Sequence, residues 1–142
     1  MNSFMVSRET QVTFVDTSAW YALYVWKDLH HVAAATWLKA NRQPLLTTDY
    51  VIDETLTLMR SHDEGTVAIE FGTHAFEQRL ATIHSIASDE IAAAWQVFRD
   101  YDDKDWSFTD CTSKVVMERH KIATAFTFDH HFRQFGTVAV AP

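Results

Sequence analysis

Apolar residues follow two alternating patterns along this chain: short runs rich in β-branched or aromatic residues, and longer segments with helical spacing. The short runs predict strands at residues 12–16, 45–47, 81–86, 122–128 and 137–141. The helical spacing predicts helices at residues 17–26, 30–42, 49–60, 61–79, 88–101 and 107–120, with a short helix or turn at 129–135. Because strands alternate with helices, we expect an α/β fold, a three-layer α/β/α sandwich with a mostly parallel central sheet.

Polar residues at the predicted helix starts suggest where some of these helices begin. SHDE at 61–64 matches a capping box, with Ser61 as the cap, and predicts a helix running to about Arg79. Ser88 is the expected N-cap of the following helix. SFTD at 107–110 has the same spacing of Ser and acid, so it opens a further helix.

Length and composition favour one domain without a flexible linker. The chain has 142 residues, of which 47% are hydrophobic, and it contains three glycines and two prolines. Cys111 is the only cysteine, so no disulfide forms within the chain and a reducing cytoplasm suits it. The first residues lack the pattern of a signal peptide, and no apolar run reaches membrane-spanning length. We therefore expect a cytoplasmic protein with no membrane partner.

Four acidic residues are placed where the predicted topology would bring them together. Asp16 and Asp129 end the two most apolar strands, and ligands of open parallel sheets gather beyond such carboxyl ends. Glu54 lies one to two turns inside its helix, and Asp110 lies in a first helical turn. Each residue alone also has a structural explanation: a helix cap, a turn or a solvated face.

Three segments resemble the PIN-domain ribonucleases, and within them the VapC-type toxins: VDTSAWYAL, DETLTLM and SFTDCTSKVVMERHKIATAFTFDHHF. The resemblance spans about residues 12–140. It implies a parallel α/β/α sandwich, a single PIN-like catalytic domain at 12–142, and the acidic set described above with Ser18 beside its first member. The first strand starts about ten residues later than is usual in the family, so residues 1–11 are expected to be an extension or a matter of start-site choice.

Crowded carboxylates repel one another, and a hard divalent cation such as Mg²⁺ or Mn²⁺ relieves this. We expect Asp16, Asp110 and Asp129 to be the metal ligands, the last directly or through water. Glu54 would position water or a second ion, and Ser18 would hydrogen-bond a carboxylate or phosphate. Together with Asp16, Asp110 and Asp129, Glu54 completes the predicted catalytic set.

Supporting and substrate-binding residues are less sharply indicated. Lys114 lies at i+4 from Asp110 and is a candidate to meet a phosphate or hold that carboxylate, although a plain exposed ion pair is the favoured explanation. Trp20 is a candidate for stacking on a flipped-out base, against a simple core role. Arg42 and Arg133 are candidate phosphate contacts, against a plain surface role.

Asp105, the histidine pairs and Cys111 have simple structural explanations. Asp105 is a possible fifth acid of the site, with solvated loop charge as the alternative. The pairs His30–His31 and His130–His131 lack the ordered spacing of a zinc site. Cys111 shows no base partner and is expected to be a small buried residue.

The residues and the resemblance together favour a metal-dependent endoribonuclease that hydrolyses single-stranded or loop RNA, tRNA or rRNA, leaving a 5′-phosphate and a 3′-hydroxyl. The resemblance also implies a toxin, a small cognate antitoxin that feeds a peptide across the active-site groove, and a homodimer. The net charge of −7 runs against nucleic-acid binding, since phosphate attraction normally comes from Lys and Arg.

Two alternatives stay open. One is a Mg-dependent phosphoryl-transfer or phosphoacceptor α/β domain, although VDTSAW offers no second Asp and no Lys follows the late strands. The other is a non-catalytic PIN-like binding module, which a metal-binding titration would separate from the enzyme.

Overall fold

The computed structural model describes residues 11–136 and 139–142. Within that part of the chain, a five-stranded parallel sheet has the strand order β3-β2-β1-β4-β5. The strands are β1 (Thr13–Val15), β2 (Leu45–Thr48), β3 (Thr82–His84), β4 (Thr124–Phe126) and β5 (Ala139–Ala141). The predicted α/β fold with a parallel sheet is confirmed.

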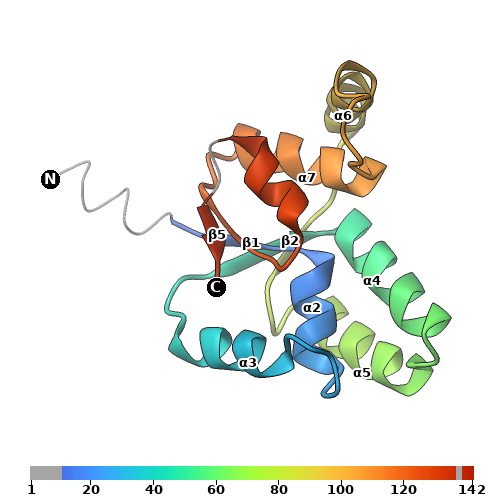
Figure 1. Ribbon diagram of the computed structural model, residues 1–142, viewed down its shortest axis with the longest axis vertical. Helices are drawn as coiled ribbons and strands as arrows, with labels where there is room; N and C mark the ends of the chain where they lie inside the picture. Colours follow the sequence, from blue (N-terminus) through green and yellow to red (C-terminus); the bar gives the residue numbers. More distant parts are fainter. Residues whose placement is uncertain (1–10, 137–138) are drawn as a thin grey trace, which may run out of the picture.

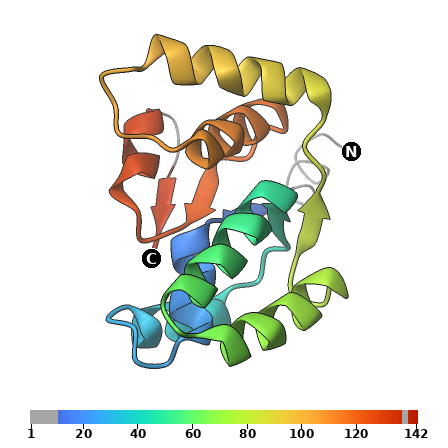
Figure 2. The same ribbon diagram turned by 90° about the vertical axis from the view of Figure 1, so that its right-hand side faces the viewer.

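Helices occupy every crossover between the first four strands, as right-handed parallel connections require. They are α2 (Thr17–Tyr24), α3 (His31–Ala40), α4 (Asp49–Ser61), α5 (Gly65–Phe76), α6 (Ser88–Asp100) and α7 (Phe108–Arg119), followed by the 3₁₀ helix η1 (His130–Phe135). In Figure 1, α2, α3 and α5 lie on one side of the sheet, and α6, α7 and η1 lie on the other. Helix α4 contacts members of both layers, namely α2, α5 and α7, and Figure 2 shows α6 lying across α7 as the outermost helix.

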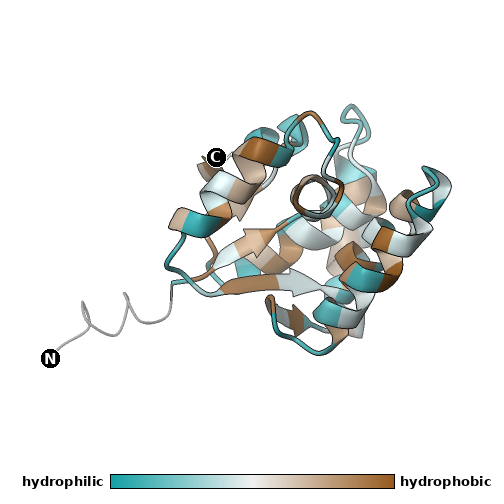
Figure 3. Ribbon diagram, turned by 90° about the horizontal axis from the view of Figure 1, so that it is seen from below, coloured by the Kyte–Doolittle hydropathy of each residue, from teal (hydrophilic) through white to brown (hydrophobic). Residues whose placement is uncertain are grey.

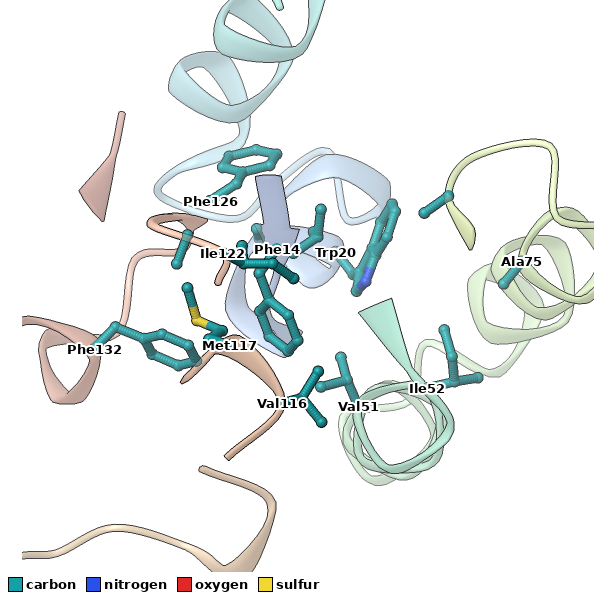
Figure 4. Packing of buried hydrophobic residues seen from close by; sticks show 14 of the residues in the cluster. Phe14, Trp20, Val51, Ile52, Ala75, Val116, Met117, Ile122, Phe126 and Phe132 are labelled. Atoms are coloured by element: carbon teal, nitrogen blue, oxygen red, sulfur yellow. The ribbon is translucent and has the colours of Figure 1, made fainter. Parts of the chain in front are cut away.

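The core is built on the two central strands. Phe14 of β1 and Phe126 of β4 are fully buried. Phe132 of η1 packs against Phe14 from one layer, with ring centroids 6.2 Å apart. In the other layer, Trp20 of α2 packs on Phe71 of α5 at 5.5 Å. Figure 4 shows this cluster around β1, and Figure 3 shows hydrophobic residues, in brown, along the strands and on the neighbouring helices.

Two predicted helix caps are wrong, although the helices that they were meant to start are present. Ser61 is the last residue of α4, and its hydroxyl donates to the carbonyl of Leu58 instead of accepting a cap hydrogen bond. Helix α5 begins after Glu64, which makes no side-chain cap. Ala87, not Ser88, occupies the N-cap position of α6, where the Glu90 carboxylate accepts from the Ala87 N–H.

The ends of the chain lie largely outside this description. Of the expected extension at 1–11, residues 1–10 lie outside the described residues, and Gln11 accepts a hydrogen bond from Gln43. The last predicted strand is present at Ala139–Ala141, while positions 137–138 lie outside. No helix of the described chain is both long and apolar enough to cross a membrane.

Candidate active site

A cleft of about 330 Å³ opens at the carboxyl ends of β1 and β4. All four predicted acids line it, so the convergence expected from topology is confirmed. The lining residues are Asp16, Thr17, Ser18, Glu54, Leu58, Asp105, Ser107, Asp110, Asp129 and His131. They come from the end of β1 and α2, from α4, from the loop before α7, from α7 itself and from the segment after β4, which are far apart in the sequence.

Asp16 follows the last residue of β1 and is nearly fully buried. Its Oδ2 accepts hydrogen bonds from the Thr127 hydroxyl at 2.9 Å and the Ser18 hydroxyl at 3.1 Å, and it caps α2 through the Ser18 N–H. Asp16 therefore has the structural role that its position suggested, and one of its carboxylate oxygens is fixed by that role.

Ser18 and Thr127 join the ends of the two central strands. The Ser18 hydroxyl lies 3.1 Å from that of Thr127 and accepts from the Phe128 N–H at 2.9 Å. Thr127 in turn accepts from the Asp129 N–H at 2.9 Å. Ser18 thus hydrogen-bonds a carboxylate, as expected, and the pair fixes Asp16 relative to Asp129.

Asp110 and Asp129 are linked by a histidine. Asp110 completes a capping box with Ser107, each N–H donating to the other side chain at 3.0 Å. His131 Nδ1 lies 3.0 Å from Asp110 Oδ2 and 3.3 Å from Asp129 Oδ1. Asp129 Oδ1 also accepts from the His131 N–H at 2.9 Å, which starts η1. His131 therefore holds the two carboxylates at a fixed separation.

Glu54 reaches the cleft from α4, on the side opposite to η1. Its Oε1 accepts a hydrogen bond from the Thr17 hydroxyl at 2.6 Å, which ties α4 to the start of α2. This contact orients the carboxylate toward the other acids.

The electrostatics of the cleft are those of crowded anions. Burial and, after it, the nearby charge of Asp110 together raise the pKa of Asp16 to about 7, against the hydrogen bond from Thr127. Burial also raises the pKa of Asp110 and of Glu54, and the charge of Asp129 contributes to both rises. A positive charge bound among these carboxylates would stabilise their ionised forms.

The three aspartates have a donor arrangement that fits a hard divalent ion. In each, one oxygen carries all the hydrogen bonds that the described residues make to the carboxylate: Asp16 Oδ2, Asp110 Oδ2 and Asp129 Oδ1. The second oxygen of each is left for a ligand in the cleft. Near the cleft, only Asp129, His130 and His131 bring possible ligand atoms within 4.8 Å of one another among the described residues. The other carboxylates therefore fit best an ion that keeps part of its water shell, as Mg²⁺ does.

The predicted supporting and substrate-binding residues, apart from Ser18, are not among the residues that line the cleft. Trp20 is 1% exposed and donates from its indole nitrogen to Thr47, so the expectation that it stacks on a base is wrong. Arg42 precedes β2 at the amino ends of the strands, the edge opposite to the cleft, which contradicts its expected substrate contact. Lys114 pairs with Glu118, the simple ion pair that was the alternative. Arg133 is exposed on η1, and its phosphate contact stays a prediction.

Three other residues lie in or near the cleft: Asp105, Cys111 and His131. Asp105 lines the cleft as the possible fifth acid. Cys111 is buried, as expected, and burial raises the pKa of its thiol to about 11. The sequence alone predicts no role for His131, because adjacent histidines seldom bind one zinc ion. Its position two residues after Asp129, at a strand end, is the sequence feature that could have indicated its place in the cleft.

Comparison with known proteins agrees with this geometry. The sequence matches the family model of the PIN domain over residues 13–138. The 23S rRNA-specific endonuclease VapC20 of Mycobacterium tuberculosis is 34% identical over 133 residues, which make up 91% of this chain and 98% of that protein.

Solved structures of similar fold agree with the family match. The crystal structure of Mycobacterium tuberculosis VapC20, described as a sarcin-ricin loop cleaving toxin, is similar with a TM-score of 0.85 and 28% identity, covering 93% of this chain and all of that one. A toxin–antitoxin complex from Klebsiella pneumoniae contains the same fold, with a TM-score of 0.64, 12% identity and coverage of 89% and 95%. The chain therefore belongs to the PIN-domain ribonuclease family, among the VapC-type toxins.

Proposed function

We propose that this chain is a Mg²⁺- or Mn²⁺-dependent endoribonuclease that cuts a single-stranded loop of ribosomal RNA. The observation that carries this proposal is the meeting of Asp16, Glu54, Asp110 and Asp129 in one cleft. A phosphoryl-transfer domain is disfavoured, because the family match covers the whole acidic set.

Within the cleft we assign roles by hydrogen bonding. Asp16, Asp110 and Asp129 would hold the ion through the oxygen that the described chain leaves unbonded, directly or through water. Glu54, fixed on one side by Thr17, would orient the attacking water from the α4 side. Ser18 and Thr127 keep the Asp16 carboxylate in position, and His131 does so for the other two aspartates.

A divalent ion held there supplies positive charge to the scissile phosphate and acidifies an attacking water. The chain's own contribution is to hold four carboxylates at fixed positions at the cost of their mutual repulsion. Among the described residues that line the cleft there is no lysine or arginine, so this part of the chain offers the phosphate little positive charge there.

The substrate is inferred from the relative that matches nearly end to end. Because this chain covers 98% of the 23S rRNA-specific endonuclease and shares its fold at a TM-score of 0.85, we propose a loop of 23S rRNA as the substrate, with tRNA as the competing candidate. Loop nucleotides suit a narrow cleft, since unstacked bases and their phosphates can enter it singly.

We also propose that a small antitoxin binds this chain, that the chain forms a homodimer, and that both act in the cytoplasm. Family membership supports the antitoxin. Large apolar side chains exposed on two outer helices support protein partners: Ile69 and Phe76 on α5 are 65% and 64% exposed, and Trp95 on α6 is 51% exposed.

The direct test incubates the purified chain with labelled 23S rRNA and tRNA in Mg²⁺, Mn²⁺ or EDTA. We expect metal-dependent cuts that leave a 5′-phosphate, and a loss of at least about 100-fold in rate for Asp16→Asn and Asp110→Asn, the scale of removing a group that positions transition-state charge. Asp53→Asn is the matched control, because Asp53 is an exposed acid on α4 beside Glu54 that does not line the cleft.

The outcomes separate the competing ideas. Cleavage that persists in both site variants would overturn the catalytic assignment. Stoichiometric Mn²⁺ binding without cleavage of either RNA would favour a non-catalytic PIN module. Cleavage of tRNA in preference to 23S rRNA would keep the enzyme and replace the substrate.

A further inference from the structure

A second group of possible metal ligands lies outside the active cleft. It joins His84, the last residue of β3, Glu90 in the first turn of α6, and His120, which directly follows α7. One ligand atom from each lies within 4.8 Å of the other two. Asp110 on α7 and His120 just after it are ten residues apart, about 15 Å along a helix axis, so this group is separate from the acidic cleft.

Both imidazoles present the same nitrogen to one carboxylate. His84 Nε2 lies 2.8 Å and 3.1 Å from the two oxygens of Glu90. His120 Nε2 lies 3.5 Å from Glu90 Oε2, and the two rings meet edge to face with centroids 4.7 Å apart. Adjacent ligands of a tetrahedral ion with bonds of about 2.05 Å are about 3.3 Å apart. The observed separations lie on both sides of that value.

The carboxylate at the centre of the group is rigidly placed. Glu90 is 5% exposed, and its Oε1 accepts from the Ala87 N–H at 2.8 Å. Such a backbone hydrogen bond orients a ligating carboxylate in metal sites, where a supporting contact of this kind fixes the ligand's direction. The ion pair between Arg119 and Asp89, at 2.7 Å, joins the same two helices beside it.

A purely structural role explains only part of this arrangement. Ala87 and His84 already satisfy Glu90 as the capping residue of α6. His120 adds only a long contact to Glu90, because 3.5 Å is beyond the usual range for a strong hydrogen bond from an N–H donor to a carboxylate. Its Nε2 nevertheless faces the same carboxylate oxygen, and its side chain is 44% exposed, so solvent reaches the group from that side.

We propose that His84, Glu90 and His120 form a Zn²⁺ site that ties the end of β3 to α6 and α7. Two imidazole nitrogens and one carboxylate oxygen are a ligand set that zinc favours and that Mg²⁺ does not. A tetrahedral ion would keep a fourth position toward solvent on the His120 side. Figure 2 shows the chain passing from β3 directly into α6, which lies over α7, so one ion would fasten the outermost helix to the sheet.

The test is a Zn²⁺ titration of the full chain after chelator treatment, by calorimetry and by competition with a zinc-binding dye, with thermal melts alongside. We expect one Zn²⁺ per chain at this site, with a rise in Tm. His120→Ala should weaken binding by at least about tenfold, because even the loss of a supporting contact costs about 10–100-fold. His84→Gln should do the same, and Mg²⁺ should not compete. Neither measurement needs RNA.

Two control variants locate the bound ion. His62→Ala removes an exposed histidine outside both groups and should bind Zn²⁺ as the parent does. His131→Ala removes a ligand of the other candidate group, with Asp129 and His130, and should also keep the zinc-dependent rise in Tm. Circular dichroism confirms folding, and the exposed His120 carries the argument if His84→Gln does not fold.

Three results would overturn the proposal. The first is undiminished Zn²⁺ affinity in a folded His120→Ala variant. The second is binding lost in His131→Ala alone, which would place the ion at the active cleft. The third is no Zn²⁺ binding by the parent chain at tens of micromolar, which would leave the group a hydrogen-bonded cap.

Discussion

The aspartates of the cleft each use their two carboxylate oxygens for different purposes. Asp16 caps α2, Asp110 completes the cap of α7, and Asp129 starts η1, in each case through one oxygen. From the sequence alone, a helix cap and a catalytic ligand are alternative explanations of each of these residues, but in the structure the two roles are compatible. The same side chain satisfies a helix end and leaves its other oxygen to the cleft.

Replacing Asp16 by asparagine should change how stability depends on pH. With a folded-state pKa of about 7 against 3.8 for an ordinary aspartate, the folded chain keeps its proton between these values while the unfolded chain releases it. The free energy of unfolding of the metal-free protein therefore falls as pH rises from about 4 to 7. Asp16→Asn should abolish that fall and be more stable at pH 8 by on the order of 1–3 kcal/mol. Thermal melts in EDTA from pH 4 to 8 measure this.

The same experiment has two internal checks. Asp53→Asn should follow the parent's pH dependence, because that acid is exposed. Added Mg²⁺ should stabilise the parent more at pH 8 than at pH 5, since protons compete for the same carboxylate. Parallel pH curves for the parent and Asp16→Asn would show that Asp16 ionises normally.

Individual elements were largely predictable because each has a strong periodic pattern. Within the helix predicted at residues 49–60, Ile52, Leu56 and Met59 recur at the i, i+4, i+7 spacing of one helix face, and Ile52 and Met59 are buried in the core. Helix starts were less predictable. The SHDE motif at 61–64 has capping spacing, but α4 continues through Ser61 and the chain turns at Asp63, whose φ is 58°. A cap motif does not reveal which of two adjacent helices contains it.

Gly72 in the middle of α5 gives a prediction at this scale. An added Cβ would meet only the flexible end of Leu56, at 3.4 Å, within ordinary van der Waals contact. Gly72→Ala should therefore stabilise the helix by roughly 0.5–1 kcal/mol. Gly136→Ala is the contrast, because Gly136 has a φ of 93° and a side chain there is strained. Chemical denaturation of both variants tests this, and a loss of stability in Gly72→Ala would mean that Leu56 cannot yield.

At the scale of the whole molecule, the sequence predicted which acids meet but not what surrounds them. The parallel pairing of β1 with β4 places Asp16 and Asp129 at the same edge of the sheet, whatever the side-chain details. Which way a side chain faces depends on packing that no local pattern encodes. Trp20 is buried in the core, and Arg42 lies at the amino ends of the strands, the edge of the sheet opposite to the cleft. His131 became the link between two acids only because η1 folds back toward α7.

The charge distribution leads to a last prediction, about salt. The chain carries a net charge of −7, and within residues 11–136 and 139–142 no lysine or arginine lines the cleft, so we expect few cationic side chains to neutralise RNA phosphates. Two phosphate contacts to a single strand would give a slope near −1.4 in log affinity against log salt, about a sevenfold loss between 50 and 200 mM. We therefore expect kcat/KM on a short loop RNA, at fixed Mg²⁺, to fall less than about tenfold over that range. Arg133→Gln should flatten the slope by about 0.7 if this exposed residue of η1 makes one of the contacts. A fall of about 300-fold or more, the scale of six or more contacts to a single strand, would instead require an extended basic surface contributed by a second chain or partner.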